Sequence, residues 1–173
     1  MIRALFFDID GTLVSFNTHS IPHSTVQALQ MAKAKGIKIF ISTGRPYALI
    51  NNLDAIKHLI DGYITANGAY CFVGEEPVSC TPIPANEVEW IINQTDAQDF
   101  ACIVVGQKDY TTIHPSSESE RIFKGLLNVP DLRSHGISSN CATFSLPGST
   151  AVYTALPTKF SPAAQSPFSF IAS

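Results

Sequence analysis

Charged residues are scarce in this sequence: they make up 14% of its 173 residues, and the formal net charge is -3. Nucleic-acid-binding domains normally carry a basic patch or stripe, which 11 Lys and Arg residues against 14 Asp and Glu residues do not supply. We therefore expect no nucleic-acid partner. The hydrophobic content of 45% predicts a globular chain that can bury a core.

Long hydrophobic runs and paired cysteines are also lacking. Near the N-terminus, residues 4–7 form the apolar run, which is too short for a signal-peptide core or a membrane span. We expect a cytoplasmic protein without a membrane partner. The cysteines lie far apart without Cys-x-x-Cys spacing, so neither a zinc site nor a disulfide framework is indicated. They are Cys71, Cys80, Cys102 and Cys141.

The N-terminal half predicts a strand, a helix and a second strand. Residues 3–8, "RALFFD", form an apolar run that ends in a glycine-containing loop, and residues 37–42, "IKIFIS", form another. Between them, Ser24 and Gln27 resemble a capping box, and Gly36 is placed to end the helix. Such a βαβ unit makes the two strands parallel.

The next segment predicts another helix and a hairpin. Pro46 suits the first turn of a helix over residues 45–59, with Leu49, Leu53 and Ile56 as its inner stripe. A strand at residues 62–66 follows. The Asn67-Gly68 pair then predicts a two-residue hairpin into an antiparallel strand at residues 69–73.

The pattern changes near residue 81, where two prolines in "TPIPAN" predict a boundary. A helix at residues 86–95, strands at 100–105 and 109–114, and a helix at 116–127 capped by Ser117 and Glu120 follow. Residues 132–173 differ again, because all acids lie at or before Asp131, serines are frequent, and no helical or strand period is sustained. The domains we expect are therefore residues 1–81, 82–131 and an atypical 132–173.

Two motifs converge in the predicted sheet. Asp8 and Asp10 follow the first strand, and residues 42–45, "STGR", follow the second, so both lie at the carboxyl edge where open parallel sheets bind ligands. Two neighbouring carboxylates repel each other unless a cation or an asymmetric protonation state separates their roles, and a divalent cation such as Mg²⁺ meets this need. Asp8 can then attack phosphorus while Asp10 acts as general acid and base. Gly11, Thr43 and Gly44 suit a close approach to phosphoryl oxygens, which makes phosphoryl transfer the reaction predicted.

The motifs "FFDIDGTLV", "IKIFISTGRP" and "DGYITANGAY" resemble the Cof-type phosphatases of the haloacid dehalogenase superfamily, which carry a type IIB cap. The resemblance implies an α/β fold: a Rossmann-like parallel-sheet core, here incomplete, and the beginning of an α/β type II cap. It implies Mg²⁺ as cofactor and small phosphorylated metabolites, often sugar phosphates, as substrates.

The resemblance also implies roles for individual residues. Asp8 would form an aspartyl-phosphate, while Asp10 would be the acid and base and give a backbone carbonyl to Mg²⁺. Thr43 would bind the phosphoryl group. Arg45, Asn67 and Gly68 would lie near the site, with Arg45 and Asn67 among the residues that bind substrate or phosphate. Taken alone, however, Arg45 suits equally a surface position at a helix start, and Asn67 suits a simple left-handed turn residue.

Two family features are missing. The resemblance implies a lysine after the cap, then Gly-Asp and a further Asp, but Lys159 is the only lysine after Lys124 and no acid follows Asp131. We therefore expect this chain to be a poor phosphatase. A parallel sheet without its later strands would expose an apolar edge and face, which favours aggregation or pairing with another chain.

Rival functions stay open at this point. They are a sugar phosphomutase, which the same aspartate pair could serve, and a non-catalytic phospho-ligand binder or oligomerising remnant. The oligomeric state is not predicted.

We predict that residues from about 133 onward come from a shifted reading frame rather than from a genuine disordered tail, because composition, periodicity and family resemblance all change there. Sequencing the gene from codon 120 past its stop and translating every frame tests this. We expect another frame to encode a lysine followed by Gly-Asp and a second Asp. Absence of these motifs from all frames would make the tail authentic and favour the binding or remnant function.

Overall fold

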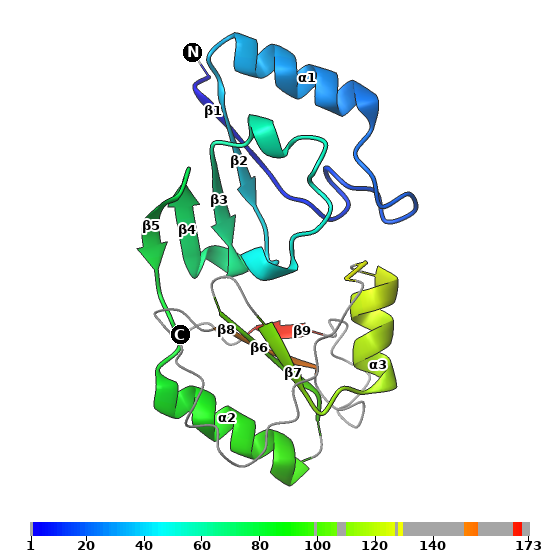
Figure 1. The fold of residues 1–173 in the computed structure, drawn as a ribbon, viewed down its shortest axis with the longest axis vertical. Helices are drawn as coiled ribbons and strands as arrows, with labels where there is room; N and C mark the ends of the chain where they lie inside the picture. The colour runs from blue at the N-terminus through cyan, green and yellow to red at the C-terminus, as the bar shows by residue number, and fades with distance from the viewer. Residues whose placement is uncertain are drawn as a thin grey trace. The chain divides into compact units, whose positions relative to one another are not determined.

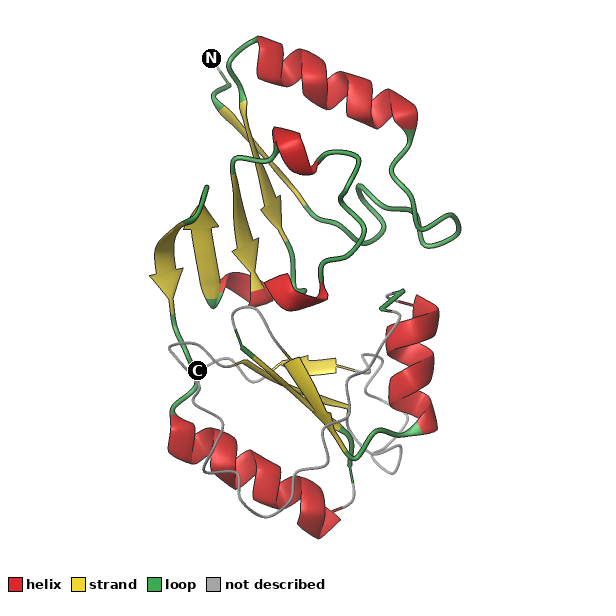
Figure 2. Ribbon diagram, viewed as in Figure 1, coloured by secondary structure: helices red, strands yellow, loops and turns green. Residues whose placement is uncertain are grey.

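The computed structural model describes residues 2–98, 100–106, 110–126, 128–129, 151–155 and 168–170. The chain divides into two compact units, residues 1–81 and 82–173. Among the described helices, none is long and apolar enough to cross a membrane. The expected α/β class with a mainly parallel core sheet is confirmed (Figures 1 and 2).

The first unit is built on a five-stranded sheet in the order β1-β2-β3-β4-β5. Its strands are β1 Ala4–Phe7, β2 Lys38–Ser42, β3 Gly62–Thr65, β4 Tyr70–Val73 and β5 Glu76–Cys80. β1, β2 and β3 are parallel, whereas β4 and β5 extend the sheet antiparallel. The carboxyl ends of β1 and β2 therefore lie at one edge, as the βαβ prediction requires.

Helix α1, His23–Ala34, connects β1 to β2. The predicted capping box is wrong, because the helix follows Pro22 and has no side-chain cap. The Pro22 carbonyl instead accepts the amides of Thr25 and Val26, so the first turn closes on the backbone. The predicted end is confirmed, since Gly36 adopts a φ of +76° and donates its amide to the Lys33 carbonyl.

The predicted helix over residues 45–59 is wrong. The segment forms two short 3-10 helices, η1 Tyr47–Leu49 and η2 Lys57–Leu59, because Pro46 is extended and the Asn pair at 51–52 favours turns over helix. Its apolar stripe is nevertheless buried in the unit's core. Packed with α1, the segment covers one face of the sheet, the face that carries Ile39 and Ile41.

The hairpin between β3 and β4 is antiparallel, as predicted, but its connection is longer than two residues. Residues 66–69 form it, including η3 Ala66–Gly68, with Asn67 left-handed at φ 55° and ψ 31°. Strand β5 was not predicted. It follows a turn at Gly74, which has a φ of +59°, and its residues are all exposed, so no apolar alternation marked it in the sequence.

The second unit contains the predicted helix–strand–strand–helix run. Its elements are α2 Ala85–Gln98, β6 Cys102–Val105, β7 Tyr110–Ile113, α3 Ser117–Glu120 and the π-helical turn η4 Arg121–Leu126. Val88 and Ile91 of α2 pack against Cys102, Val104 and Ile113 on one face of the sheet. This arrangement gives the unit a core of its own.

The start of α3 differs from the prediction. Ser116 and Ser119 cap it reciprocally: the Ser119 Oγ accepts the Ser116 amide at 2.8 Å, and the Ser116 Oγ accepts the Ser119 amide at 3.2 Å. The predicted pair Ser117 and Glu120 lies one residue further along and does not form this cap. A capping box usually has Glu or Gln at the position that Ser119 occupies here, so the sequence did not indicate this cap.

Two strands, β8 Ala151–Ala155 and β9 Phe168–Phe170, extend this antiparallel sheet to the order β7-β6-β8-β9. They were not predicted, and they fall in the atypical stretch 132–173. The rest of that stretch, with Cys141, lies outside the described residues. Cys71 and Cys102 are free thiols, and burial raises the pKa of Cys102 to about 12.

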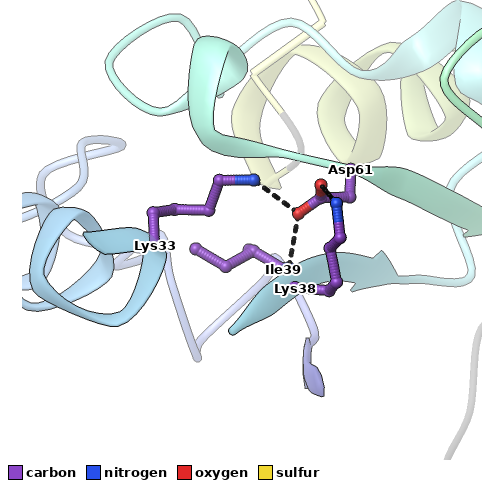
Figure 3. A network of polar contacts seen from close by, with 4 residues as sticks. All are labelled: Lys33, Lys38, Ile39 and Asp61. Atoms are coloured by element: carbon purple, nitrogen blue, oxygen red, sulfur yellow. Dashed lines mark hydrogen bonds and ion pairs between the residues drawn. The ribbon is translucent and has the colours of Figure 1, made fainter. Parts of the chain in front are cut away.

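Asp61, just before β3, joins three elements at the amino edge of the parallel sheet (Figure 3). Its Oδ2 accepts the Lys33 Nζ at 2.7 Å and the Ile39 amide at 2.8 Å, and its Oδ1 accepts the Lys38 Nζ at 3.0 Å. The side chain is only 12% exposed. Burial opposes its ionisation, but the bonds from Lys33, Ile39 and Lys38 outweigh that effect and lower the pKa of Asp61 to about 2.

We predict that Asp61→Asn lowers the free energy of unfolding at pH 7 by about 2 kcal/mol. Because the folded pKa is depressed, this contribution is present above the unfolded pKa of about 4 and is lost as the pH falls toward 2. Urea melts from pH 7 to pH 2.5 measure it. The two proteins should converge at low pH, and the exposed control Asp54→Asn should follow the parent throughout. A constant difference at every pH would contradict the assignment.

Candidate functional site

The first motif forms a tight turn at the carboxyl end of β1. Ile9 is fully buried, which places Asp8 and Asp10 on the opposite side of the backbone from the core. The Ile9 carbonyl accepts the amides of Leu13 and Val14, and the Gly11 amide donates to the Val14 carbonyl at 2.9 Å. Gly11 has a φ of +75°, which favours glycine in this turn. The motif therefore holds its two carboxylates on a fixed loop.

The second motif is fixed against β3. The Thr43 amide donates to the Ile64 carbonyl at 2.9 Å, and the Arg45 carbonyl accepts the Ala66 amide at 3.0 Å. The Asn67 amide in turn donates to the Thr43 carbonyl at 3.3 Å. Thr43 and Arg45 are both buried. The residues after β2 and the residues after β3 thus form one hydrogen-bonded edge.

A paired hydrogen bond joins the two motifs. The Arg45 Nε donates to Asp10 Oδ2 and the Arg45 Nη2 donates to Asp10 Oδ1, both at 2.7 Å. The Arg45 Nη1 donates to the Leu49 carbonyl at 3.2 Å. Arg45 is 5% exposed and Asp10 is 21% exposed. The guanidinium therefore holds the Asp10 carboxylate in one orientation from beneath the surface.

The structure places the predicted residues Asp8, Asp10, Gly11, Thr43, Gly44, Arg45 and Asn67 at the carboxyl edge of the first unit's parallel strands. Asp8 is exposed, and within the described residues its carboxylate bonds no other group. The alternative of Arg45 as a surface residue at a helix start is wrong, because its side chain is buried on Asp10. The left-handed Asn67 fits the turn alternative.

The donors at this edge fit Mg²⁺. The described residues contain no group of three or more His, Cys, Asp or Glu side chains that could hold a metal ion, and the acidic side chains of the two motifs at this edge are those of Asp8 and Asp10. Mg²⁺ is normally bound through one or two carboxylates, with water and substrate phosphate completing its shell. Because Arg45 occupies both Asp10 carboxylate oxygens, the free carboxylate of the pair is that of Asp8.

Sequence reasoning missed the anchor of Arg45. The Leu49 carbonyl that receives Nη1 is a backbone group in η1, where the sequence predicted an α-helix. A carbonyl in a continuous helix would bond within the helix. The short 3-10 turn leaves this carbonyl available to Arg45, and no side-chain motif signals it.

Comparisons with known proteins agree with this geometry. Residues 5–135 match the family model described as haloacid dehalogenase-like hydrolase. A solved member of a phosphoryl-transfer superfamily, studied for its trigonal-bipyramidal intermediate, is 44% identical with a TM-score of 0.79, covering 90% of this chain and 59% of that one. A solved HAD subclass IIB sugar phosphatase is 50% identical with a TM-score of 0.69, covering 77% and 52%.

A curated relative, the HMP-PP phosphatase of Yersinia pestis, is 32% identical over 101 residues, covering 56% of this chain and 37% of the relative. The chain spans about half or less of the length of the curated relatives that it matches. The matched model nevertheless includes both motifs and most of the chain. The chain belongs to the haloacid dehalogenase-like hydrolases.

Proposed function

We propose that the first unit carries the active site of a Mg²⁺-dependent phosphatase for small phosphorylated metabolites, with sugar phosphates as the leading class. The observation that carries this proposal is the paired bond between Arg45 and Asp10, which brings the two predicted phosphoryl-transfer motifs together. Relatives named as a sugar phosphatase and an HMP-PP phosphatase support the substrate class. A cytoplasmic location belongs to the same proposal.

The proposed reaction uses Asp8 and Asp10 in two steps. Asp10 enters the reaction protonated, with one carboxyl oxygen released from Arg45. An Asp8 carboxylate oxygen attacks phosphorus, the bond from phosphorus to the leaving oxygen breaks, and Asp10 gives that oxygen its proton. Water then attacks the aspartyl-phosphate, Asp10 takes the water proton, and the bond between Asp8 and phosphorus breaks to release phosphate. Mg²⁺, held by Asp8 and the Asp10 backbone, would neutralise charge on the phosphoryl group. The exposed, unpaired carboxylate of Asp8 suits the attacking role.

Thr43, Gly44, Gly11 and Asn67 are the groups proposed to bind the phosphoryl oxygens. The Thr43 Oγ already accepts the Arg45 amide at 3.1 Å, so its own proton is directed elsewhere and can be donated to a phosphoryl oxygen. Gly44 lies against Asn67: a Cβ at Gly44 would come within 3.1 Å of the Asn67 Oδ1. A larger residue at Gly44 would therefore displace the Asn67 side chain from this edge.

Arg45 is proposed as a positioning residue that acts through Asp10. Its position two residues after Thr43 suggests contact with phosphate. Its Nε and both Nη atoms, however, donate to Asp10 and to the Leu49 carbonyl. Asp10 must exchange a proton with the leaving oxygen, and an error of about 1 Å in such a group can cost roughly 100-fold in rate. A planar, bidentate partner fixes that carboxylate better than a lysine could.

We expect Asp8 to be the phosphate acceptor even where turnover by this chain is weak. Beryllofluoride bound to a carboxylate imitates an acyl phosphate, so with Mg²⁺ it should raise the Tm of the parent chain by about 5 °C or more at saturating concentration. Asp8→Asn should abolish the rise. The matched control Asp54→Asn, an exposed acid of the same unit, should retain it.

An unchanged Tm in the parent would contradict the proposed acceptor site. A turnover assay on sugar phosphates tests the proposed reaction separately from binding. Mg²⁺-dependent hydrolysis by the parent chain that Asp8→Asn abolishes would support the function, and hydrolysis that Asp8→Asn leaves unchanged would contradict it.

We predict strong coupling between Arg45 and Asp10 in a double-mutant cycle. Arg45→Met leaves a largely buried carboxylate without its partner and should lower the free energy of unfolding by about 3 kcal/mol. In the Asp10→Asn background the same substitution should cost at least 1 kcal/mol less. Arg45→Lys should recover only part of the loss, since it offers a single donor site. Additive effects of the two substitutions, measured by urea unfolding, would show that Arg45 does not act through Asp10.

A further inference from the structure

Tyr47 is the first residue of η1, the short turn that follows the second motif, and its ring lies in an aromatic cluster. The ring is nearly perpendicular to two others: its centroid is 5.4 Å from that of Tyr63 at an angle of 75°, and 5.0 Å from that of Phe72 at 88°. Tyr63 and Phe72 themselves stack, with centroids 5.0 Å apart at 21°. Tyr47 therefore packs against two rings at once in an arrangement that the charge distribution of aromatic rings favours.

The sheet fixes the two partners of Tyr47. Tyr63 of β3 pairs directly with Phe72 of β4 in the antiparallel register, and Phe72 is buried. Burial raises the pKa of Tyr63 to about 12, and the neighbouring Tyr47 adds to this rise. The cluster is thus anchored in the β3–β4 hairpin and partly shielded from water. Tyr47 consequently attaches η1 to the sheet.

The turn η1 carries the backbone group that holds Arg45. The Leu49 amide donates to the Pro46 carbonyl at 2.9 Å, which closes the turn around Tyr47. The Leu49 carbonyl is then presented to the Arg45 Nη1, which donates to it at 3.2 Å. A displacement of the Tyr47 ring would therefore shift this carbonyl relative to the guanidinium.

The proposed reaction needs this acceptor, because one Asp10 oxygen is released from Arg45 before the proton is given up. The bond to the Leu49 carbonyl can still hold the guanidinium during that step. We propose that Tyr47 is a positioning residue for Asp10: its ring fixes η1, and η1 fixes the guanidinium that orients the Asp10 carboxylate. The inference rests on the proposed function for the role of Asp10, whereas the packing and the bonds can be tested without turnover.

The Arg45 Nε proton reports this arrangement directly, because it is bonded to Asp10 Oδ2. In the parent chain we expect a slowly exchanging 15N–1H signal near neutral pH, assigned by its loss in Arg45→Lys. Tyr47→Ala should raise the exchange rate of this proton roughly tenfold or more, because the guanidinium then leaves Asp10 more often. Tyr47→Phe should keep the parent's rate, since the ring contacts remain.

Tyr70→Ala is the matched control. Tyr70 belongs to the same cluster, with its ring centroid 5.1 Å from that of Phe72, but it lies in β4 and not in η1. Loss of its ring should also lower the urea midpoint, yet the Arg45 signal should stay as in the parent. A merely structural role of Tyr47 would instead give the same exchange rate in Tyr47→Ala and Tyr70→Ala, and that result would overturn the proposal.

Tyr47→Leu covers the case in which Tyr47→Ala does not fold. Leucine keeps apolar bulk in the cluster without the perpendicular ring, so the exchange rate should still rise, by roughly threefold or more. An unchanged rate in this variant would overturn the proposal, and so would a parent chain without a protected Arg45 signal. The Tm rise with beryllofluoride depends on Asp8, so its absence would contradict the phosphatase proposal while the Arg45 signal decides this one separately.

Discussion

The parallel alignment of β1 with β2 is the constraint on which the first unit depends. It brings Asp8 and Asp10 to the same edge as Thr43 and Arg45, and one acidic residue then secures each end of the sheet. At the amino edge, Asp61 gathers Lys33, Lys38 and the Ile39 amide, so it fixes the end of α1 to the starts of β2 and β3. At the carboxyl edge, Arg45 fixes Asp10. The same kind of charge-assisted bond thus stabilises the fold at one end and orients the carboxylate of the proposed acid and base at the other.

The carboxylates of Asp61 and Asp10 differ in their partners and in their exposure to solvent. Asp61 receives bonds from three groups and keeps its charge at a low pKa, which suits a purely structural carboxylate. Within the part of the chain that the structure describes, the Asp10 carboxylate bonds one residue, Arg45, and its side chain is more exposed than that of Arg45. The role proposed for Asp10, proton exchange with substrate and water, needs this access, while its partner must stay fixed. The Leu49 carbonyl helps to hold Arg45 in place. Because it is a backbone group, substitution of the Leu49 side chain would not remove it.

The sequence was sufficient to predict the βαβ unit, the antiparallel extension and the position of both motifs, because apolar runs and glycine signals determine these features locally. The sequence was insufficient where contacts between residues distant in the sequence determine the structure. The stripe Leu49, Leu53 and Ile56 is buried as predicted, but without an α-helix, since burial of these side chains is compatible with two short turns. The partner of Arg45 could not be predicted either. A buried arginine and a phosphate-binding arginine have the same sequence signature, and only the tertiary pairing distinguishes them.

The pairing of β1 also determines how precisely Asp8 is held. Asp8 directly follows Phe7, the last residue of β1, and Phe7 is paired with Ile41 of β2. On its other side the chain is fixed by the turn in which the Gly11 amide donates to the Val14 carbonyl. Nucleophilic attack requires the reacting atoms to be held about 3–3.5 Å apart in a fixed alignment. The proposed role of Asp8 as nucleophile therefore depends on the strand pairing before it and on the turn after it.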